Sequence, residues 1–200
     1  MTARPIIVWS KAVALCLAAS ACLHSPTAPS SALPRLGLAG QSNAVLLRPI
    51  LAEVAWVTGA GDQGATPITC WSGTSIDGIC WRNLQTALRQ DKPLDAFIWW
   101  QGESDADNSN YAEPFRDLIA RVRAETAQPR LLILVVQWGS VYGGRHGGAE
   151  DAQRAFVASD SAARFVRTDD LPFRDGTHMT DDGYRQLSAR IVGIVKGASK

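Results

Sequence analysis

Histidine, cysteine and long apolar runs are scarce in this chain, and each scarcity argues against a class of function. Its 200 residues include only three histidines and four cysteines. They form no cluster with the spacing of metal ligands, so we expect no metal ion and no other cofactor. The formal net charge is +1 and no stretch carries charge of one sign, so we do not expect nucleic acid as a partner. The near-zero net charge favours a neutral substrate.

The composition is that of one globular domain. Hydrophobic residues make up 46% of the sequence and charged residues 20%. A chain of this length encloses one sizeable core, and the sequence contains no internal repeats. We therefore expect one folded domain, which we place at residues 35–200.

The N-terminus has the features of an export signal. Arg4 and Lys11 precede an apolar run at residues 12–19, and small residues follow it. The run is too short to span a bilayer permanently, so we assign residues 1–21 to a signal peptide. The letters ASAC at residues 19–22 also resemble the lipobox of bacterial lipoproteins, in which a lipid on Cys22 would attach the protein to a membrane. The alternative is an ordinary signal peptide followed by a coincidental cysteine. Either interpretation predicts export to the bacterial periplasm or cell envelope.

Export also affects how the next segment and the remaining cysteines are interpreted. Residues 22–34 are rich in Pro, Ser and Ala and lack an apolar period, so we expect a tether there. Cys16 would leave with the signal peptide, and only Cys70 and Cys80 remain in the folded domain. In an oxidising compartment this pair predicts a disulfide, with two buried free thiols as the alternative.

Short apolar runs alternate with stretches of helical period from residue 36 onward, which is typical of a parallel sheet covered by helices. Two of the runs, at residues 96–100 and 131–138, are unbroken, as expected for strands buried on both faces. The predicted strands lie at residues 35–39, 54–57, 96–100, 131–138 and 165–166. The pattern predicts an α/β/α sandwich with about five parallel strands and four helices, in which ligands bind at the carboxyl ends of the strands.

Three helices are indicated by apolar stripes at helical spacing, the first of them formed by Trp81, Leu84 and Leu88 at i, i+3, i+7. One follows Asp77, the second begins near Tyr111, and the third follows Thr180. Asn110 with Glu113 resembles a capping box for the second helix, and Thr180 is expected to cap the third.

The first chemical motif is GQSN at residues 40–43, directly after the first predicted strand. A tight strand-to-helix turn can present the Ser42 hydroxyl beside backbone amides and a helix N-terminus. This is the setting of a nucleophile. Ser42 as a simple N-cap is the alternative, and Ala44 stands where the α/β-hydrolase elbow has its closing glycine.

The second motif is DGTH at residues 175–178, just before the last helix. Its spacing allows the Asp175 carboxylate to hold one ring nitrogen of His178 while the other faces a serine hydroxyl. A surface loop with an exposed histidine is the alternative. His146 is the other histidine of the folded part, and it has no acid at this spacing.

The third motif is WQGESD at residues 100–105, which ends the most apolar predicted strand. We expect the Gln101 amide to help bind an oxyanion beside the backbone amide of Ser42. Ser104 is a rival nucleophile, although the neighbouring Asp105 carboxylate would oppose its activation. A loop that is polar without a chemical role is the alternative.

The three motifs in this order resemble the SGNH hydrolases of the sialate O-acetylesterase and acetylxylan esterase group, over residues 36–195. The resemblance implies a flavodoxin-like fold, Ser42 as nucleophile, and Asp175 and His178 as its partners. It maps the oxyanion and acid region onto Gln101 and Glu103, with Glu103 as a second acid or a brace. A further oxyanion glycine would be Gly73 or Gly78.

The resulting prediction is a serine esterase that removes acetyl groups from a saccharide through an acyl-enzyme. We favour Asp175 over Glu103 as the carboxylate that orients His178. The alternatives are a lipid or thioester hydrolase on the same fold, or an inactive carbohydrate-binding protein, since seven tryptophans are available for stacking on sugars. The glycine-rich loop at residues 139–148, with Tyr142, Arg145 and His146, either contacts substrate or is a solvent loop.

Overall fold

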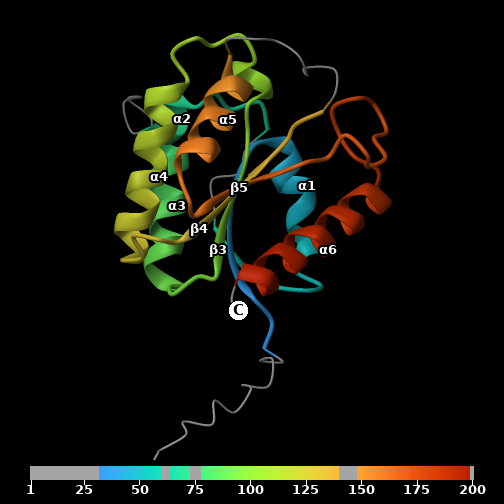
Figure 1. The fold of residues 1–200 in the computed structure, drawn as a ribbon, viewed down its shortest axis with the longest axis horizontal. Coiled ribbons are helices and arrows are strands. Elements are labelled where there is room, and N and C mark those ends of the chain that lie inside the picture. The colour runs from blue at the N-terminus through green and yellow to red at the C-terminus, as the bar shows by residue number, and fades with distance from the viewer. Residues whose placement is uncertain (1–31, 60–63, 73–77, 140–147, 199–200) are drawn as a thin grey trace, which may run out of the picture. The chain divides into compact units, whose positions relative to one another are not determined.

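A computed structural model describes residues 32–59, 64–72, 78–139 and 148–198 (Figure 1). Several of the predictions above concern residues outside these ranges, so the structure does not test them. They are the signal peptide at 1–21, Cys22 and most of the tether, Gly73, and the loop residues Tyr142, Arg145 and His146.

A five-stranded sheet forms the centre of the fold, and its order is β2-β1-β3-β4-β5. Every pair of neighbouring strands is parallel. The strands are β1 Arg35–Gly40, β2 Trp56–Thr58, β3 Ala96–Trp100, β4 Leu132–Val136 and β5 Ala163–Val166. This doubly wound order is the flavodoxin-like arrangement, so the predicted α/β fold is confirmed.

Helices cover both faces of the sheet, which makes three layers. Helices α1 Ser42–Leu51 and α6 Asp181–Ala198 pack against one another on one face, at the right in Figure 1. The opposite face carries α2 Thr69–Ser72, α3 Ile79–Gln90, α4 Ala112–Thr126 and α5 Ala149–Ser159. The sequence analysis did not anticipate α2, which is a single turn, or α5, which follows the glycine-rich loop.

The core confirms the apolar patterns that were identified in the sequence. Every residue of β3 is buried, and Trp99 and Trp100 have no exposed surface at all. In α3 the predicted stripe buries Leu84 and Leu88 completely, while Trp81 is half-buried. An all-apolar strand is stable here because helices cover the sheet on both sides.

One predicted helix cap is confirmed and one is wrong. The hydroxyl of Thr180 accepts a hydrogen bond from the amide of Gly183 at 3.1 Å, at the start of α6. The capping box at Asn110 does not form, because α4 begins at Ala112 and Tyr111 occupies the N-cap position. The N-cap position therefore lies one residue later than predicted. The Tyr111 side chain is fully buried, and its hydroxyl donates to Oε1 of Gln101.

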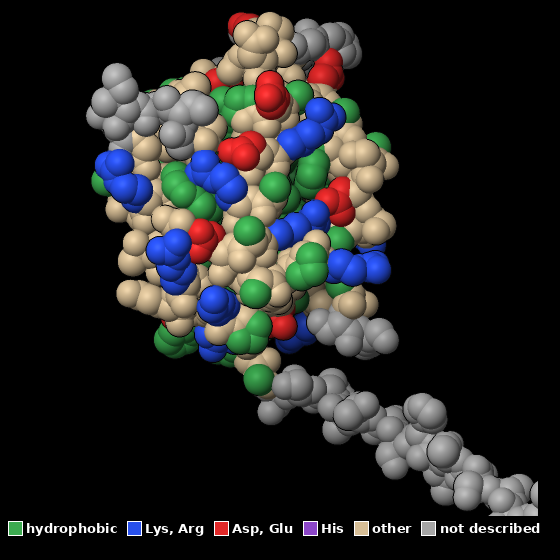
Figure 2. Space-filling view, turned by 90° about the vertical axis from the view of Figure 1, so that its left-hand side faces the viewer, with side chains coloured by type: hydrophobic (Ala, Val, Ile, Leu, Met, Phe, Trp, Pro, Cys, Tyr) green, Lys and Arg blue, Asp and Glu red, His purple; other side chains and the backbone are tan. Residues whose placement is uncertain are grey.

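Charged side chains of both signs are interspersed on the helical side of the domain shown in Figure 2. Two of the ion pairs join neighbouring elements. Arg89 of α3 lies 2.8 Å from Glu125 of α4, and Arg123 of α4 lies 2.6 Å from Asp160 after α5. These four charged side chains are therefore paired within the domain.

Candidate active site

The hydroxyl of Ser42 is presented by a sharp turn between β1 and α1. Ser42 is the first residue of α1, and the amide of Gln41 donates to the carbonyl of Trp100 at 3.0 Å. Gly40 has φ of +150°, and a Cβ atom there would lie 2.0 Å from the same carbonyl oxygen. Only glycine allows this close approach, which brings the end of β1 against β3 and starts the helix directly at the serine.

His178 lies beside Ser42 at the carboxyl end of the sheet. Its Nε2 atom is 3.1 Å from Ser42 Oγ, and its Nδ1 atom is 3.0 Å from Oδ2 of Asp175. Because a carboxylate can only accept, the Nδ1 atom donates and the lone pair of Nε2 faces the serine hydroxyl. The structure therefore brings Ser42, His178 and Asp175 into one chain of hydrogen bonds.

The loop holds Asp175 in place through its own backbone. Oδ1 of Asp175 accepts the amides of Thr177 at 3.0 Å and His178 at 2.7 Å. The His178 amide, together with its ring, lowers the pKa of Asp175 to about 2. The carboxylate is thus ionised throughout the range in which an imidazole titrates.

A second cluster, which the sequence analysis did not anticipate, surrounds Asn43. The fully buried Asn43 amide group donates to Oε1 of Glu103 at 2.9 Å and to the carbonyl of Thr177 at 3.0 Å. Its own oxygen accepts the hydroxyl of Tyr184 at 2.8 Å. One side chain therefore connects α1, the end of β3, the loop of His178 and α6. The only sequence signal was the position of Asn43 directly after Ser42.

Glu103 lies in this cluster and not against the imidazole. It is only 8% exposed, and within the described residues its Oε2 atom has no hydrogen-bond partner. Burial raises the pKa of this carboxyl group. Both ring nitrogens of His178 are occupied by Ser42 and Asp175, so the structure brings Asp175 to the ring as the sequence analysis favoured, and Glu103 to Asn43.

The family described as "Carbohydrate esterase, sialic acid-specific acetylesterase" matches residues 43–195 of this chain. The chain belongs to this family of carbohydrate esterases. The match begins directly after Ser42 and includes the Asn43 cluster and His178. No curated protein matches the sequence at a significant level.

Solved structures with this fold include carbohydrate esterases and SGNH hydrolases. A protein from Arabidopsis thaliana has a TM-score of 0.58 at 21% identity, over 78% of this chain and 68% of that chain. A carbohydrate acetylesterase from Xanthomonas citri has a TM-score of 0.57 at 19% identity, over 73% of this chain but only 39% of that one. A family 3 carbohydrate esterase from Clostridium thermocellum has a TM-score of 0.54 at 13% identity, over 84% of this chain and 99% of that one. Identities this low show the fold.

The side chain of Gln101 is bound elsewhere in this member of the family. Its Nε2 atom donates to Oδ2 of Asp105 at 2.6 Å and to the carbonyl of Thr66 at 3.1 Å, while Oε1 accepts the hydroxyl of Tyr111 at 2.7 Å. Gln153 extends the network by donating to the Gln101 carbonyl at 2.6 Å. Both hydrogens of the Gln101 amide are therefore used in a buried network, so its predicted oxyanion role is not favoured by this geometry.

The remaining residues of the third motif are also placed by the structure. Ser104 is exposed on a short 3-10 turn, Glu103–Asp105, and its amide lies 3.5 Å from Oε1 of Gln41. Both ring nitrogens of His178 are bonded to Ser42 and Asp175, so this base is not paired with Ser104. The carboxylate of Asp105 accepts hydrogen bonds from the Gln101 amide and from the backbone amide of Ile68.

The predicted disulfide is present and joins Cys70 of α2 to Cys80 of α3, with 5.4 Å between their Cα atoms. It closes the segment that contains residues 73–77. Of the two candidate oxyanion glycines, Gly78 occupies the N-cap position of α3, and Gly73 lies outside the described residues.

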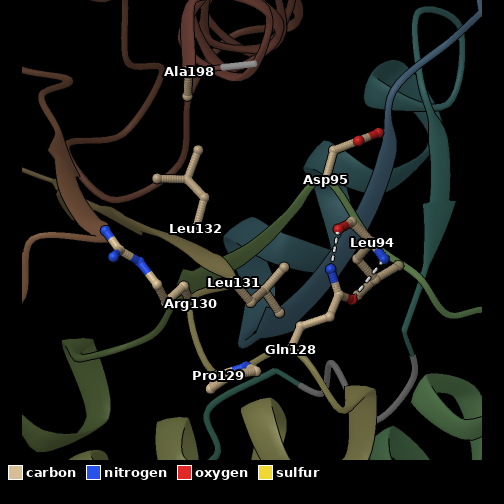
Figure 3. Close-up of a pocket in the computed structure, with 8 residues that line it drawn as sticks. All are labelled: Leu94, Asp95, Gln128, Pro129, Arg130, Leu131, Leu132 and Ala198. Carbon is tan, nitrogen blue, oxygen red and sulfur yellow. Dashed lines mark hydrogen bonds between the residues drawn. The ribbon is translucent and has the colours of Figure 1, made fainter. Parts of the chain in front are cut away.

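A cavity of about 450 Å³ lies at the opposite edge of the sheet from Ser42 (Figure 3). The Gln128 side chain there is tied to the backbone of Leu94, whose amide donates to Oε1 at 2.8 Å and whose carbonyl accepts Nε2 at 2.7 Å. Asp95 and Arg130 stand on different sides of this hollow, and the residues that line it include no serine, cysteine or histidine.

Within the described residues, no group of three or more His, Cys, Asp or Glu side chains is arranged to hold a metal ion. Across the same parts of the chain, no helix has the length and apolar character needed to cross a membrane.

Proposed function

We propose that this carbohydrate esterase is a serine esterase that hydrolyses acetyl esters of a saccharide. The observation that supports it most directly is the chain of hydrogen bonds from Ser42 Oγ to His178 Nε2, and from His178 Nδ1 to Asp175, at 3.1 and 3.0 Å. The family and the resemblance of the motifs agree with this reaction.

In the first step, Ser42 Oγ attacks the ester carbonyl carbon while His178 Nε2 takes the hydroxyl proton. The Asp175 carboxylate holds the ring in the tautomer that exposes Nε2 and stabilises the imidazolium that forms. Negative charge develops on the carbonyl oxygen. The backbone amide of Ser42 stands at the N-terminus of α1, where amides lack intrahelical partners, and it is our candidate donor to that oxygen.

The second half of the reaction returns the enzyme to its starting state. The sugar oxygen leaves with the proton from His178, which leaves an acetyl group on Ser42 Oγ. Water then attacks this acyl-enzyme while His178 accepts one of its protons, and acetic acid departs as that proton returns to Ser42, after which the acid ionises to acetate in solution. One ester and one water give one sugar hydroxyl and one acetic acid, so atoms and charge balance over the cycle.

The acyl chain and the sugar are tested separately. Hydrolysis of p-nitrophenyl acetate is measured against the octanoate, with Ser42→Ala as the matched control. A preference for acetate supports the proposal, a preference for octanoate supports a lipid or thioester hydrolase, and no turnover of either ester supports an inactive carbohydrate-binding protein. A panel of acetylated sugars then shows whether, and on which sugar, acetate is released.

A further inference from the structure

A hydrogen bond joins Asn43, the neighbour of Ser42, to Thr177, the neighbour of His178. Asn43 follows Ser42 in the first turn of α1, and Thr177 precedes His178 in its loop. The 3.0 Å contact from Asn43 Nδ2 to the Thr177 carbonyl therefore connects two backbones that are 134 residues apart in the sequence. Its length bears directly on the distance between Ser42 Oγ and His178 Nε2.

Two further contacts hold the Asn43 amide in one orientation. Glu103 Oε1 accepts its second hydrogen, and the Tyr184 hydroxyl donates to its oxygen. Burial raises the pKa of Tyr184 to about 12, so this hydroxyl keeps its proton as a donor. Both hydrogens of the Asn43 amide are therefore bonded. If the amide were flipped, its NH2 group would face the Tyr184 hydroxyl hydrogen, and its oxygen would face the acceptors Glu103 and Thr177.

We propose that Asn43 is a positioning residue that sets the distance between Ser42 and His178, with Glu103 and Tyr184 orienting it. This inference rests on the proposed function. Asn43 is fully buried, so it acts through its neighbours and not on substrate. A catalytic pair held by such a second layer of contacts loses rate when the layer shifts by a fraction of an ångström to one ångström.

Asn43→Asp is the sharpest variant, because it keeps the shape and removes both donors. The new carboxylate would face the Glu103 carboxylate and the Thr177 carbonyl, which are both acceptors. The two carboxyl groups can share one proton at low pH and repel one another when both ionise. The other charged groups that act on the cluster are His178, Asp175 and Arg174, and all three are present in every variant.

The experiment compares kcat and KM for p-nitrophenyl acetate across pH in the wild type, Asn43→Asp and Asn43→Asp/Glu103→Gln. We expect Asn43→Asp to lower kcat by about 10²-fold at neutral pH with KM unchanged. Its kcat should fall further as pH rises, over a range where the wild type is flat. In the double variant the amide introduced by Glu103→Gln can donate to the carboxylate introduced by Asn43→Asp. The fall with pH should therefore disappear, and roughly tenfold of the lost kcat should return.

A buried structural control separates positioning from loss of stability. Leu84→Ala removes a fully buried side chain from α3, which lies on the opposite face of the sheet from α1 and α6. It should lower Tm and leave kcat and its pH profile unchanged. If Asn43→Asp does not fold, Tyr184→Phe decides the question, with a roughly tenfold loss of kcat at constant KM expected.

Wild-type kcat in the variant that is measured, Asn43→Asp or Tyr184→Phe, would overturn the positioning role. A flat pH profile in Asn43→Asp, or the lack of rescue by Glu103→Gln, would overturn it as well. An inactive wild-type protein would instead overturn the proposed function, so the two failures are distinguishable.

Discussion

Asp175 binds His178 at two points, since Oδ1 accepts the backbone amide at 2.7 Å and Oδ2 lies 3.0 Å from ring Nδ1. The carboxylate therefore orients both the loop and the imidazole. Glu103 is held 2.9 Å from Asn43 and makes neither contact. Replacing these two acids should consequently have different effects.

Asp175→Asn should lower kcat by about 10⁴-fold, because the amide can stabilise the wrong tautomer of His178 and cannot stabilise an imidazolium. Glu103→Gln keeps an acceptor for Asn43 and should lower kcat by only about tenfold to a hundredfold. Measuring kcat for the two variants side by side checks this order. A Glu103→Gln enzyme that is less active than Asp175→Asn would reverse the two roles.

Ser42→Ala should abolish esterase activity and leave the fold intact. Ser42 is the first residue of α1 and Gln41 occupies the N-cap position, so loss of the hydroxyl removes no helix cap and should lower the free energy of unfolding by less than about 2 kcal/mol. Circular dichroism and turnover of p-nitrophenyl acetate check the two halves of this prediction. More than a few per cent of wild-type turnover in a folded variant would exclude Ser42 as the nucleophile.

The two acids should also affect stability with opposite dependence on pH. The folded-state pKa of Asp175, about 2, lies below its unfolded value, so its contribution is present above about pH 4 and is lost as pH falls toward 2. Glu103 has a raised folded-state pKa, so its contribution is present at low pH and is lost as pH rises.

Thermal unfolding between pH 2 and pH 8 tests this linkage. The Tm difference between the wild type and Asp175→Asn should shrink as pH falls toward 2. Glu103→Gln should gain stability relative to the wild type as pH rises, since the neutral amide avoids ionisation of a buried group. Parallel curves for the wild type and both variants would contradict the assigned directions.

The Cys70–Cys80 disulfide should stabilise the fold by about 3 kcal/mol, because it closes a loop of ten residues in the unfolded chain. Mass analysis of the native protein after alkylation without reduction should find no free thiol at these positions. The double variant Cys70→Ser/Cys80→Ser should unfold at a lower temperature. Two alkylated thiols in the native protein would disprove the bridge in solution.

Gly40→Ala should destabilise the fold by at least about 2 kcal/mol and inactivate what remains folded. The new methyl group would lie 2.0 Å from the Trp100 carbonyl, which is backbone and cannot rotate away. Gly193→Ala is the matched control, because nothing lies within 4 Å of a Cβ atom there. Unfolding by denaturant and esterase assay of both variants check the difference.

Local patterns in the sequence were sufficient for the sheet, three of its helices and the two motifs that meet at Ser42 and His178. A strand such as 96–100 is recognisable because burial on both faces requires an unbroken apolar run. The spacing of DGTH is local as well, so the pairing of Asp175 with His178 could be predicted without knowledge of the rest of the chain.

Contacts between residues distant in the sequence were decided only by the tertiary structure. Gln101 and Asn43 are both polar residues beside a motif, and nothing local distinguishes a free amide from one whose hydrogens are already bound. Parallel strands bring their carboxyl ends to one edge of the sheet, and residues from distant segments therefore meet there. The Gln101 side chain bonds to Thr66 and Tyr111. The Asn43 side chain bonds to Glu103, Thr177 and Tyr184. The sequence by itself determined the fold and the Asp175–His178 pair, since these depend on periodicity and short spacing. Tertiary packing decided which polar side chains are hydrogen-bonded to other groups of the protein, because those partners come together only in the folded core.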